Sequence, residues 1–252
     1  MKKYSIILLI ALFSVSCAEL LQIATALTNV ETPITEADNA AGLKSALDVG
    51  LANAVLSLGK EDGFMKDALL QIALPAEAQP IIQNMKLIPG GEELVSRAIL
   101  SLNRTAEDAV QEATPIFKQA ILNMSFADAT KILFGDENAA TNYLKENTSA
   151  ELVKAFSPKV RNSLEKPLVL GTSTTKSWEA LTTNYNKAAS SIASVIAGLK
   201  PIEVDIEEYV TQQAVDALFV KVAAEEKQIR QDPLARVNGL LQKIFGQLDI
   251  KQ

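Results

Sequence analysis

The sequence predicts a mainly α-helical protein: one helical domain of about eight to ten helices, behind a signal peptide and a lipid-bearing tether. Composition supports helices first. Hydrophobic residues make up 48% of the chain but aromatic ones only 5%, which favours helices packed through alanine and aliphatic side chains. The second observation is an apolar spacing of three or four residues over most of the chain, the period of an amphipathic helix.

Two stretches show this spacing most clearly. Gly59 is expected to stop the first helix, and the break at Gly90-Gly91 precedes the second, because glycine is a poor helix former and a common helix terminator. The apolar positions are Leu43, Ala46, Leu47, Leu51, Ala54, Val55 and Leu58 in the first stretch, and Val95, Ala98, Ile99, Leu102, Ala106, Ala109 and Val110 in the second.

Capping patterns mark where later helices are expected to begin. Ser125 with Asp128, and Thr148 with Glu151, have the spacing of capping boxes. Asp136 is expected to cap the helix that follows Gly135.

Proline marks two further starts, because it is favoured at the first position of a helix. Ser157-Pro158 and Asp232-Pro233 each place a capping side chain before the proline, and a long helix is expected from about Val204 to Arg230. Two segments fit this pattern less well. Leu69–Leu74 and Leu168–Thr175 are candidates for short extended segments, the second because it is rich in β-branched residues.

The N-terminus has the features of a bacterial lipoprotein signal. Lys2 and Lys3 precede an apolar run from Ile6 to Val15, much shorter than the about 20 residues that cross a bilayer. Such a segment is typical of a secretory signal peptide. It leads into Cys17, the only cysteine, in a context that resembles the lipobox. The alternative is an ordinary secretory signal followed by a free cysteine.

These features divide the chain into a signal peptide (residues 1–16), a lipidated cysteine with a flexible tether (residues 17–39) and a helical domain (residues 40–248). Ala18 follows the cysteine, which by the sorting rule of enteric bacteria favours the outer membrane, facing the periplasm. Cleavage removes two of the 24 basic residues, leaving 22 against 30 acidic ones and a formal net charge of −8. An acidic domain is unsuited to nucleic acid, so the expected membrane contact is the lipid anchor itself.

The residue inventory excludes several kinds of chemistry. The chain has no histidine, which removes Ser-His-Asp and Cys-His catalysis and histidine-ligated metals. Neither a phosphate-binding loop nor a dinucleotide fingerprint is present. We therefore assign no catalytic residue, metal or cofactor, and any acid–base chemistry would fall to Asp, Glu, Lys or Tyr.

Short patterns occur in a fixed order along the chain. They are Gly42-Leu43-Lys44, Asp62-Gly63-Phe64, Asn103-Arg104-x-Ala106-Glu107, Pro115-Ile116-Phe117, Asp128-Ala129, Ala139-Ala140-Thr141, Tyr209-Val210-Thr211, Glu225-Glu226, Ile229-Arg230-x-x-Pro233-x-x-Arg236 and Ile244-Phe245-Gly246. Together they resemble the patterns of a family of exported bacterial proteins, domain of unknown function 4197, from which Thr105 and Ala217 depart. The resemblance implies an exported protein, mostly from Gram-negative bacteria, and brings no activity, ligand or catalytic residue.

Polar residues within these patterns form a candidate buried network. Asn103 and Glu107 lie one turn apart at the edge of an apolar stripe, and Arg104 projects to nearly the opposite side. We expect Arg104 to be buried and paired; the alternative is a surface pair with Asp108. The network as predicted comprises Asn103, Arg104, Glu107, Glu225, Arg230 and Arg236.

Glu225 is the member with the sharpest expectation. It falls in the middle of the stripe formed by Ala214, Val215, Leu218, Val222 and Ile229, whereas Glu226 lies toward its edge. A buried carboxylate needs a partner, so Glu225 is expected to be mostly buried and paired with an arginine. Such a pair would fix helix register; a functional acid in a pocket is the alternative.

Three functions remain open. The first is a non-enzymatic envelope protein that binds or scaffolds a protein partner. The second is a carrier or sensor of an apolar small molecule. Such a protein needs a pocket on the order of several hundred cubic ångström, the size of known ligand sites. The third is a carboxylate-dependent hydrolase, which needs two acids with perturbed pKa values in a cleft.

Overall fold

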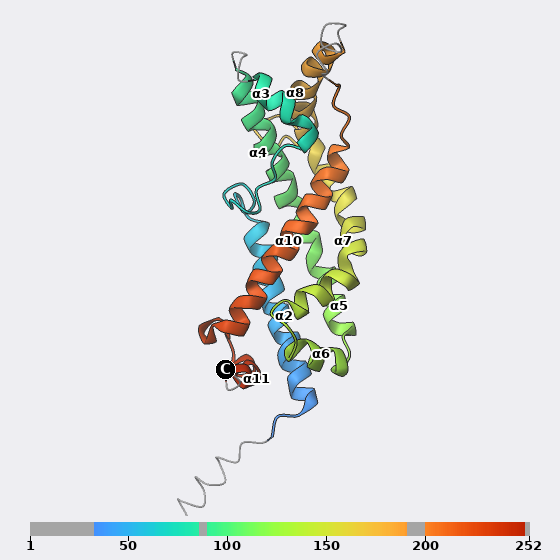
Figure 1. Ribbon diagram of the computed structural model, residues 1–252. Helices are drawn as coiled ribbons and strands as arrows, with labels where there is room; N and C mark the ends of the chain where they lie inside the picture. The colour runs from blue at the N-terminus through green and yellow to red at the C-terminus, as the bar shows by residue number, and fades with distance from the viewer. Residues whose placement is uncertain (1–32, 86–89, 191–199, 250–252) are drawn as a thin grey trace, which may run out of the picture. The chain divides into compact units, whose positions relative to one another are not determined.

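A computed structural model describes residues 33–85, 90–190 and 200–249. The predicted signal peptide and Cys17 lie outside these residues. The chain divides into two compact units, Met1–Thr35 and Glu36–Gln252, and the second is built of helices (Figure 1). The predicted mainly α fold class is confirmed. The α-helices are α2 (Glu36–Leu58), α3 (Gln79–Met85), α4 (Gly91–Ala109), α5 (Ala113–Asn123), α6 (Phe126–Leu133), α7 (Ala139–Glu165), α8 (Thr174–Ala189), α10 (Ile206–Gln231) and α11 (Gly239–Asp249), with short 3-10 turns at η2 (Ala76–Ala78), η3 (Val110–Glu112) and η4 (Pro233–Ala235).

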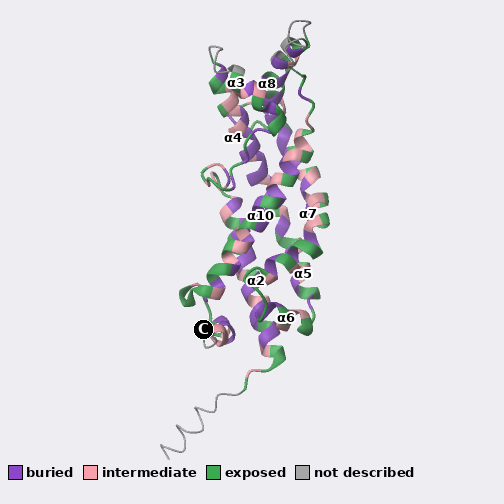
Figure 2. Cartoon of the chain, in the orientation of Figure 1, coloured by how far each residue is buried: buried purple, intermediate pink, exposed green. Residues whose placement is uncertain are grey.

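Within the second unit, α10 lies along both α7 and α2, and α4 packs against α7 and α8. The first helix, α2, also contacts α5, α6 and the last helix, α11. Buried residues follow the inner sides of these helices (Figure 2). Phe117 and Phe219 join α5 to α10 edge to face, with ring centroids 6.0 Å apart, a favoured aromatic geometry.

Several helix ends lie where local signals predict them. Helix α2 ends at Leu58, immediately before Gly59, and α4 begins after Gly90, whose φ of 79° is a left-handed conformation natural to glycine. Ser125 and Asp128 form the predicted capping box at the start of α6. Asp232 accepts a hydrogen bond from the Leu234 backbone N–H and so caps η4, with Pro233 at its start.

Two predicted starts are wrong, because both lie inside the 27-residue helix α7. Thr148 is buried and its hydroxyl donates to the Leu144 carbonyl, one turn back, a bond that threonine makes within a helix. Pro158 is accommodated inside the same helix, between the fully buried Phe156 and Val160. Tertiary packing therefore outweighs the local signals for a new helix.

The two candidate extended segments contain no strand. Residues 71–75 are irregular, and the second segment has a single antiparallel bridge between Val169 and Thr172, closed by Leu170 and Gly171 with positive φ angles of 48° and 73°. The long helix predicted from Val204 is α10, which begins two residues later. Helix α2 starts at Glu36, inside the range assigned to the tether. Across the described ranges, no helix is long and apolar enough to span a membrane.

Candidate functional site

The six residues predicted as one network do not lie together: three share one site on α4, Arg230 lies at a second site on α10, and Glu225 and Arg236 have other partners. Asn103, Arg104 and Glu107 of α4 hold the segment that follows α2; we call this group the loop cluster. Glu226 and Arg230 of α10 hold the junction between α6 and α7; we call this group the corner cluster. No hydrogen bond or ion pair among the described residues joins the two clusters, so the single network is corrected to two.

Asn103 is fully buried, and its side chain hydrogen-bonds to the backbone near Ile72. Its side-chain oxygen accepts from the Ile72 N–H at 2.9 Å, and its amide nitrogen donates to the Ile72 carbonyl at 2.9 Å and to the Ile99 carbonyl at 2.7 Å. From α10, the Tyr209 hydroxyl donates to the Ala73 carbonyl at 2.9 Å. This irregular segment thus has its backbone groups satisfied by side chains instead of by a neighbouring strand.

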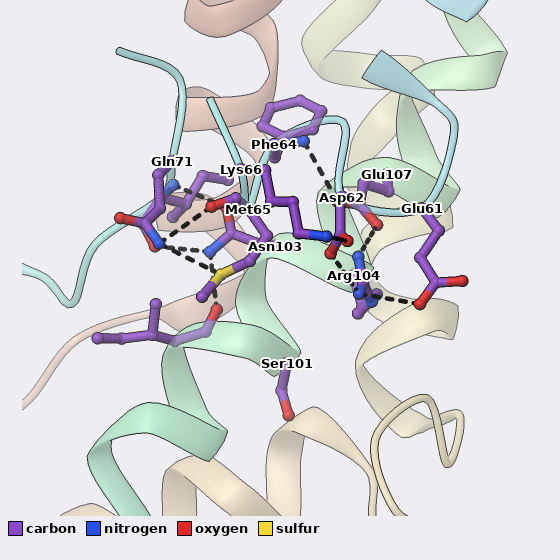
Figure 3. Close-up of polar contacts among 12 residues, drawn as sticks. Glu61, Asp62, Phe64, Met65, Lys66, Gln71, Ser101, Asn103, Arg104 and Glu107 are labelled. Atoms are coloured by element: carbon purple, nitrogen blue, oxygen red, sulfur yellow. Dashed lines mark hydrogen bonds and ion pairs between the residues drawn. The ribbon is translucent and has the colours of Figure 1, made fainter. Parts of the chain in front are cut away.

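Arg104 and Glu107 hold the preceding loop (Figure 3). The Glu107 side chain is only 5% exposed and receives Arg104 at 2.7 Å and the Phe64 N–H at 3.2 Å. Arg104 also contacts Asp62 at 2.7 Å. Hydrogen bonds from Lys66 and then from Arg104 lower the pKa of Asp62 below its usual value. Arg104 is paired as expected, but its side chain is 17% exposed and so is partly rather than fully buried.

The geometry of this loop explains the Asp62-Gly63-Phe64 pattern. Asp62 has a φ of 66°, a left-handed conformation that aspartate tolerates better than most residues. At Gly63 an added Cβ would lie 2.5 Å from the carbonyl oxygens of Ser57 and Leu58, so only glycine fits. Phe64 is then fully buried.

The surface pair proposed as the alternative for Arg104 is absent. Asp108 instead contacts Lys166 at 2.6 Å and accepts a hydrogen bond from Ser163. Burial raises the pKa of Asp108, but the hydrogen bonds from Lys166 and Ser163 outweigh it and the pKa is lowered. Asp108 therefore ties α4 to the end of α7.

Glu226 is the acid that caps α7. Its side chain is 6% exposed, and its oxygens accept from the Ala140 N–H at 3.0 Å, the Thr141 N–H at 2.8 Å and the Thr141 hydroxyl at 2.8 Å. Asn138, the residue before α7, makes no side-chain cap, and the predicted cap Asp136 is not the residue before the helix. A carboxylate at a helix N-terminus is electrostatically favourable, and here it comes from a distant helix.

Arg230 completes the corner cluster from the next turn of α10. It pairs with Glu226 at 2.9 Å, and its two terminal nitrogens donate to the carbonyls of Ile132 at 2.8 Å and Leu133 at 3.0 Å. These carbonyls belong to the last residues of α6, where cations are favoured. One ion pair therefore supplies an acceptor to the start of α7 and a donor to the end of α6.

The prediction for Glu225 is wrong, because the neighbouring Glu226 is the buried, arginine-paired acid. Glu225 is half-buried and accepts one hydrogen bond from Asn53 at 3.2 Å. Helix α10 packs against α7 as well as α2, so the edge of the apolar stripe, where Glu226 lies, is covered by the start of α7. A helical wheel shows one stripe and cannot show this second neighbour.

Arg236 is 2% exposed and closes the C-terminal end of α10. It donates to the carbonyls of Ile229 at 3.1 Å and Arg230 at 3.0 Å, and it pairs with Asp249 at 2.6 Å. It therefore fastens α11 to α10. The partners Asp62, Thr141 and Asp249 were not singled out from the sequence as members of the network; Asp62 and Thr141 lie within the quoted family patterns, but nothing local marks Asp249.

A small cavity lies beside Glu226 and Arg230 of the corner cluster. The cavity between α2, α7, α10 and α11 has a volume of about 20 Å³ and is lined by residues that include Leu47, Gly50, Val222 and Glu225. Larger recesses are open at the surface: about 280 Å³ beside Asp128 and Tyr143, and about 340 Å³ beside Ser57 and Lys66. Within the described ranges, no group of acids or cysteine is arranged to hold a metal.

Comparison with known protein families places most of the chain in one profile. The profile of a family described as "Protein of unknown function (DUF4197)" matches residues 33–246, most of the chain of 252 residues. No curated protein matches, and no solved structure matches.

Proposed function

We propose that this chain, which belongs to the DUF4197 family, is a non-enzymatic binding or scaffold module of the bacterial envelope, anchored by a lipid on Cys17. The anchor would place it at the periplasmic face of the outer membrane. Support for the anchor comes from the sequence: Lys2, Lys3, a short apolar run and a lone cysteine followed by Ala18.

One observation carries the non-enzymatic part of the proposal: the buried charged groups are engaged in holding the backbone. Glu107, Glu226, Arg230 and Arg236 each contact a loop or a helix end. A general acid or base needs a free site for a proton beside a substrate, and these groups have their oxygens or nitrogens occupied. Where a shift is resolved for a carboxyl group of the described residues, as for Asp62, Asp108 and Glu207, the pKa is lowered, whereas a carboxyl group that acts as a general acid near neutral pH needs a raised one.

The other two functions have less support. A carrier of an apolar molecule would need an enclosed pocket of roughly 300 Å³ or more, and the cavity beside Gly50 is about 20 Å³, room for about one water. A hydrolase would need two free acids in one cleft. The recess beside Tyr143 contains Asp128, Asp136 and Glu146. Asp128 is used in the capping box of α6, so a hydrolase at this recess would have to use Asp136 and Glu146.

The anchor is tested by metabolic labelling with a palmitate analogue. The wild-type chain should be labelled and remain with the membrane fraction after a high-salt wash, because acyl chains hold it by apolar contact. Cys17→Ser should lose both properties. If Cys17→Ser stays labelled and membrane-bound, the anchor is refuted.

Native mass spectrometry of the chain purified from its own membrane separates the remaining functions. The scaffold proposal expects the mass of the acylated chain, alone or with a protein partner. A small molecule of several hundred daltons retained at one copy per chain would instead favour a carrier, because such a ligand needs an enclosed site.

A further inference from the structure

Four large apolar side chains are exposed around the first part of α2, and we call them the end patch. Leu122 is 62% exposed and Phe126 61%, on the α5–α6 junction; Leu234 is 90% and Val237 66%, on the α10–α11 connection. Both connections contact α2 at adjacent positions. The Lys44 ammonium donates to the Leu122 carbonyl at 3.2 Å, and the Asn238 amide lies 3.5 Å from the Ser45 hydroxyl. In Figure 1, α6, α11 and the start of α2 lie together.

The backbone that carries the end patch is held in place. Phe126 is the first residue of α6, directly after the capping box of Ser125 and Asp128. Leu234 lies in η4, whose start is capped by Asp232. Fixed turns hold these side chains in water, although burying apolar surface is favourable. Grouped exposed apolar side chains of this kind mark a contact surface.

The position of α2 in the chain indicates the occupant. Fewer than 20 residues separate Cys17 from Glu36, where α2 begins. If it were unstructured, a linker of that length would have a mean span of about 25 Å, shorter than the roughly 35 Å of a 23-residue helix at 1.5 Å per residue. A lipid on Cys17 would therefore keep the start of α2 next to the bilayer, at high effective concentration.

Charges of both signs lie beside the end patch, with Asp128 near Phe126 and Asp232 near Leu234 as well as lysines near Leu122. Lys44 lies against Leu122, and the exposed Lys118 is one helical turn before it, so ammonium groups flank the apolar side chains. Lysine can reach phosphate oxygens while its stem lies along apolar surface. The chain as a whole is acidic, so the contact should depend on apolar insertion more than on charge.

We propose that the end patch rests on the bilayer, with Leu122, Phe126, Leu234 and Val237 inserted among the lipid headgroups. This inference rests on the proposed lipid anchor. It makes the junctions α5–α6 and α10–α11 a second, shallow membrane contact that fixes which end of the domain faces the membrane.

The test uses the full mature, acylated chain in phosphatidylcholine vesicles. Acylation consumes the only native thiol, so Phe126→Cys or Leu234→Cys can be labelled at one position with a polarity-sensitive fluorophore. Leu69→Cys is the matched control: Leu69 is 88% exposed and follows the opposite end of α2. We expect the fluorescence emission of labels at positions 126 and 234 to shift to the blue and to be quenched by brominated lipid. Quenching of these labels by iodide should be reduced at least about threefold. High salt should leave these results unchanged, because a surface held by apolar contact is little affected by screening.

Each other outcome has a distinct reading. If the acylated chain stays on the vesicles but the labels at positions 126 and 69 are equally open to iodide, the inference is overturned and the anchor stands. An unmodified Cys17, read from the intact mass, overturns both. If shielding of the labels from iodide increases with the density of protein on the vesicles, and brominated lipid does not quench them, the occupant of the end patch is a second copy of the chain. That result overturns the membrane contact.

Discussion

Replacing Glu226 with alanine should lower the free energy of unfolding by several kilocalories per mole. The carboxylate accepts from Ala140, Thr141 and Arg230, and its side chain is 6% exposed. Its loss leaves two backbone N–H groups at the start of α7 without their acceptor and leaves the Arg230 charge buried without its counter-ion.

The magnitude follows from these losses. Removing one partner of a buried ion pair costs about 3–5 kcal/mol, and losing a helix cap alone costs about 1 kcal/mol. Arg230 keeps its bonds to the Ile132 and Leu133 carbonyls, which stabilise part of its charge. We therefore expect a loss of about 3–4 kcal/mol.

Urea unfolding followed by circular dichroism measures this loss. With a slope of about 2–3 kcal/mol per molar urea, the midpoint should fall by more than about 1 M. Glu225→Ala is the matched control, one residue away on the same helix. Glu225 is half-buried and has one hydrogen bond, at 3.2 Å from Asn53, so its removal should cost less than about 1 kcal/mol.

Glu226→Gln should fall between the two, since the amide retains an oxygen acceptor but loses the charge. Arg230→Ala should cost nearly as much as Glu226→Ala, and the double variant should lose much less than the sum, as expected for partners in contact. Equal and small midpoint shifts for Glu226→Ala and Glu225→Ala would refute the assignment of Glu226 as the buried cap.

Three further predictions follow from other contacts. Arg104→Ala should destabilise the domain by about 2–3 kcal/mol, because it leaves the buried Glu107 without its cation. Arg97→Ala on the same helix removes a more exposed pair with Glu93 and should cost under about 0.5 kcal/mol. Similar melting temperatures for the two variants would contradict the contacts of the loop cluster. Gly50→Ala should stabilise the domain by up to about 1 kcal/mol through helix propensity, because the added Cβ meets only ordinary contacts at 3.5 Å. Gly42→Ala would place a Cβ 2.4 Å from Ile244 and should destabilise the domain by about 1–3 kcal/mol. Urea midpoints of the two variants shifted in the same direction would count against this packing. Hydrogen bonds keep the pKa of Asp108 below its ordinary value of 3.8, so its contribution to stability is present above that value and is lost as the pH falls through the lower folded pKa. Asp108→Asn should therefore be less stable than the wild type at neutral pH, and the gap between their urea midpoints should narrow as the pH falls below 3.8; a constant gap would show that Asp108 does not act through its charge.

The helices could be predicted from the sequence where the signal is local. The Ser125–Asp128 box begins α6 because the preceding Met124 already has an extended backbone, so the cap acts at a real helix end. The same pattern at Thr148 fails because no residue before it breaks the helix, and α7 continues through Pro158. A capping pattern therefore predicts a start only when a terminator precedes it.

The polar residues could be predicted in type but not in partner. Asn103, Arg104 and Glu107 are indeed partly or fully buried, yet their partners Asp62, Phe64 and Ile72 lie more than 30 positions earlier. Spacing along a helix gives a side chain's direction and no information about which distant loop meets it. The choice between Glu225 and Glu226 failed for the same reason, since the start of α7 decides which of them is covered.

The corner cluster also has a consequence for when the domain can fold. The α6–α7 junction takes its capping groups from Glu226 and Arg230, which lie 85 to 98 positions farther along the chain, and α2 packs against α10 and α11 at the far end of the sequence. During synthesis the first half of the domain therefore emerges before the groups that satisfy its backbone, and contacts between distant segments form slowly. A chain that folds only when its last two helices arrive stays open along most of its length until synthesis is nearly complete.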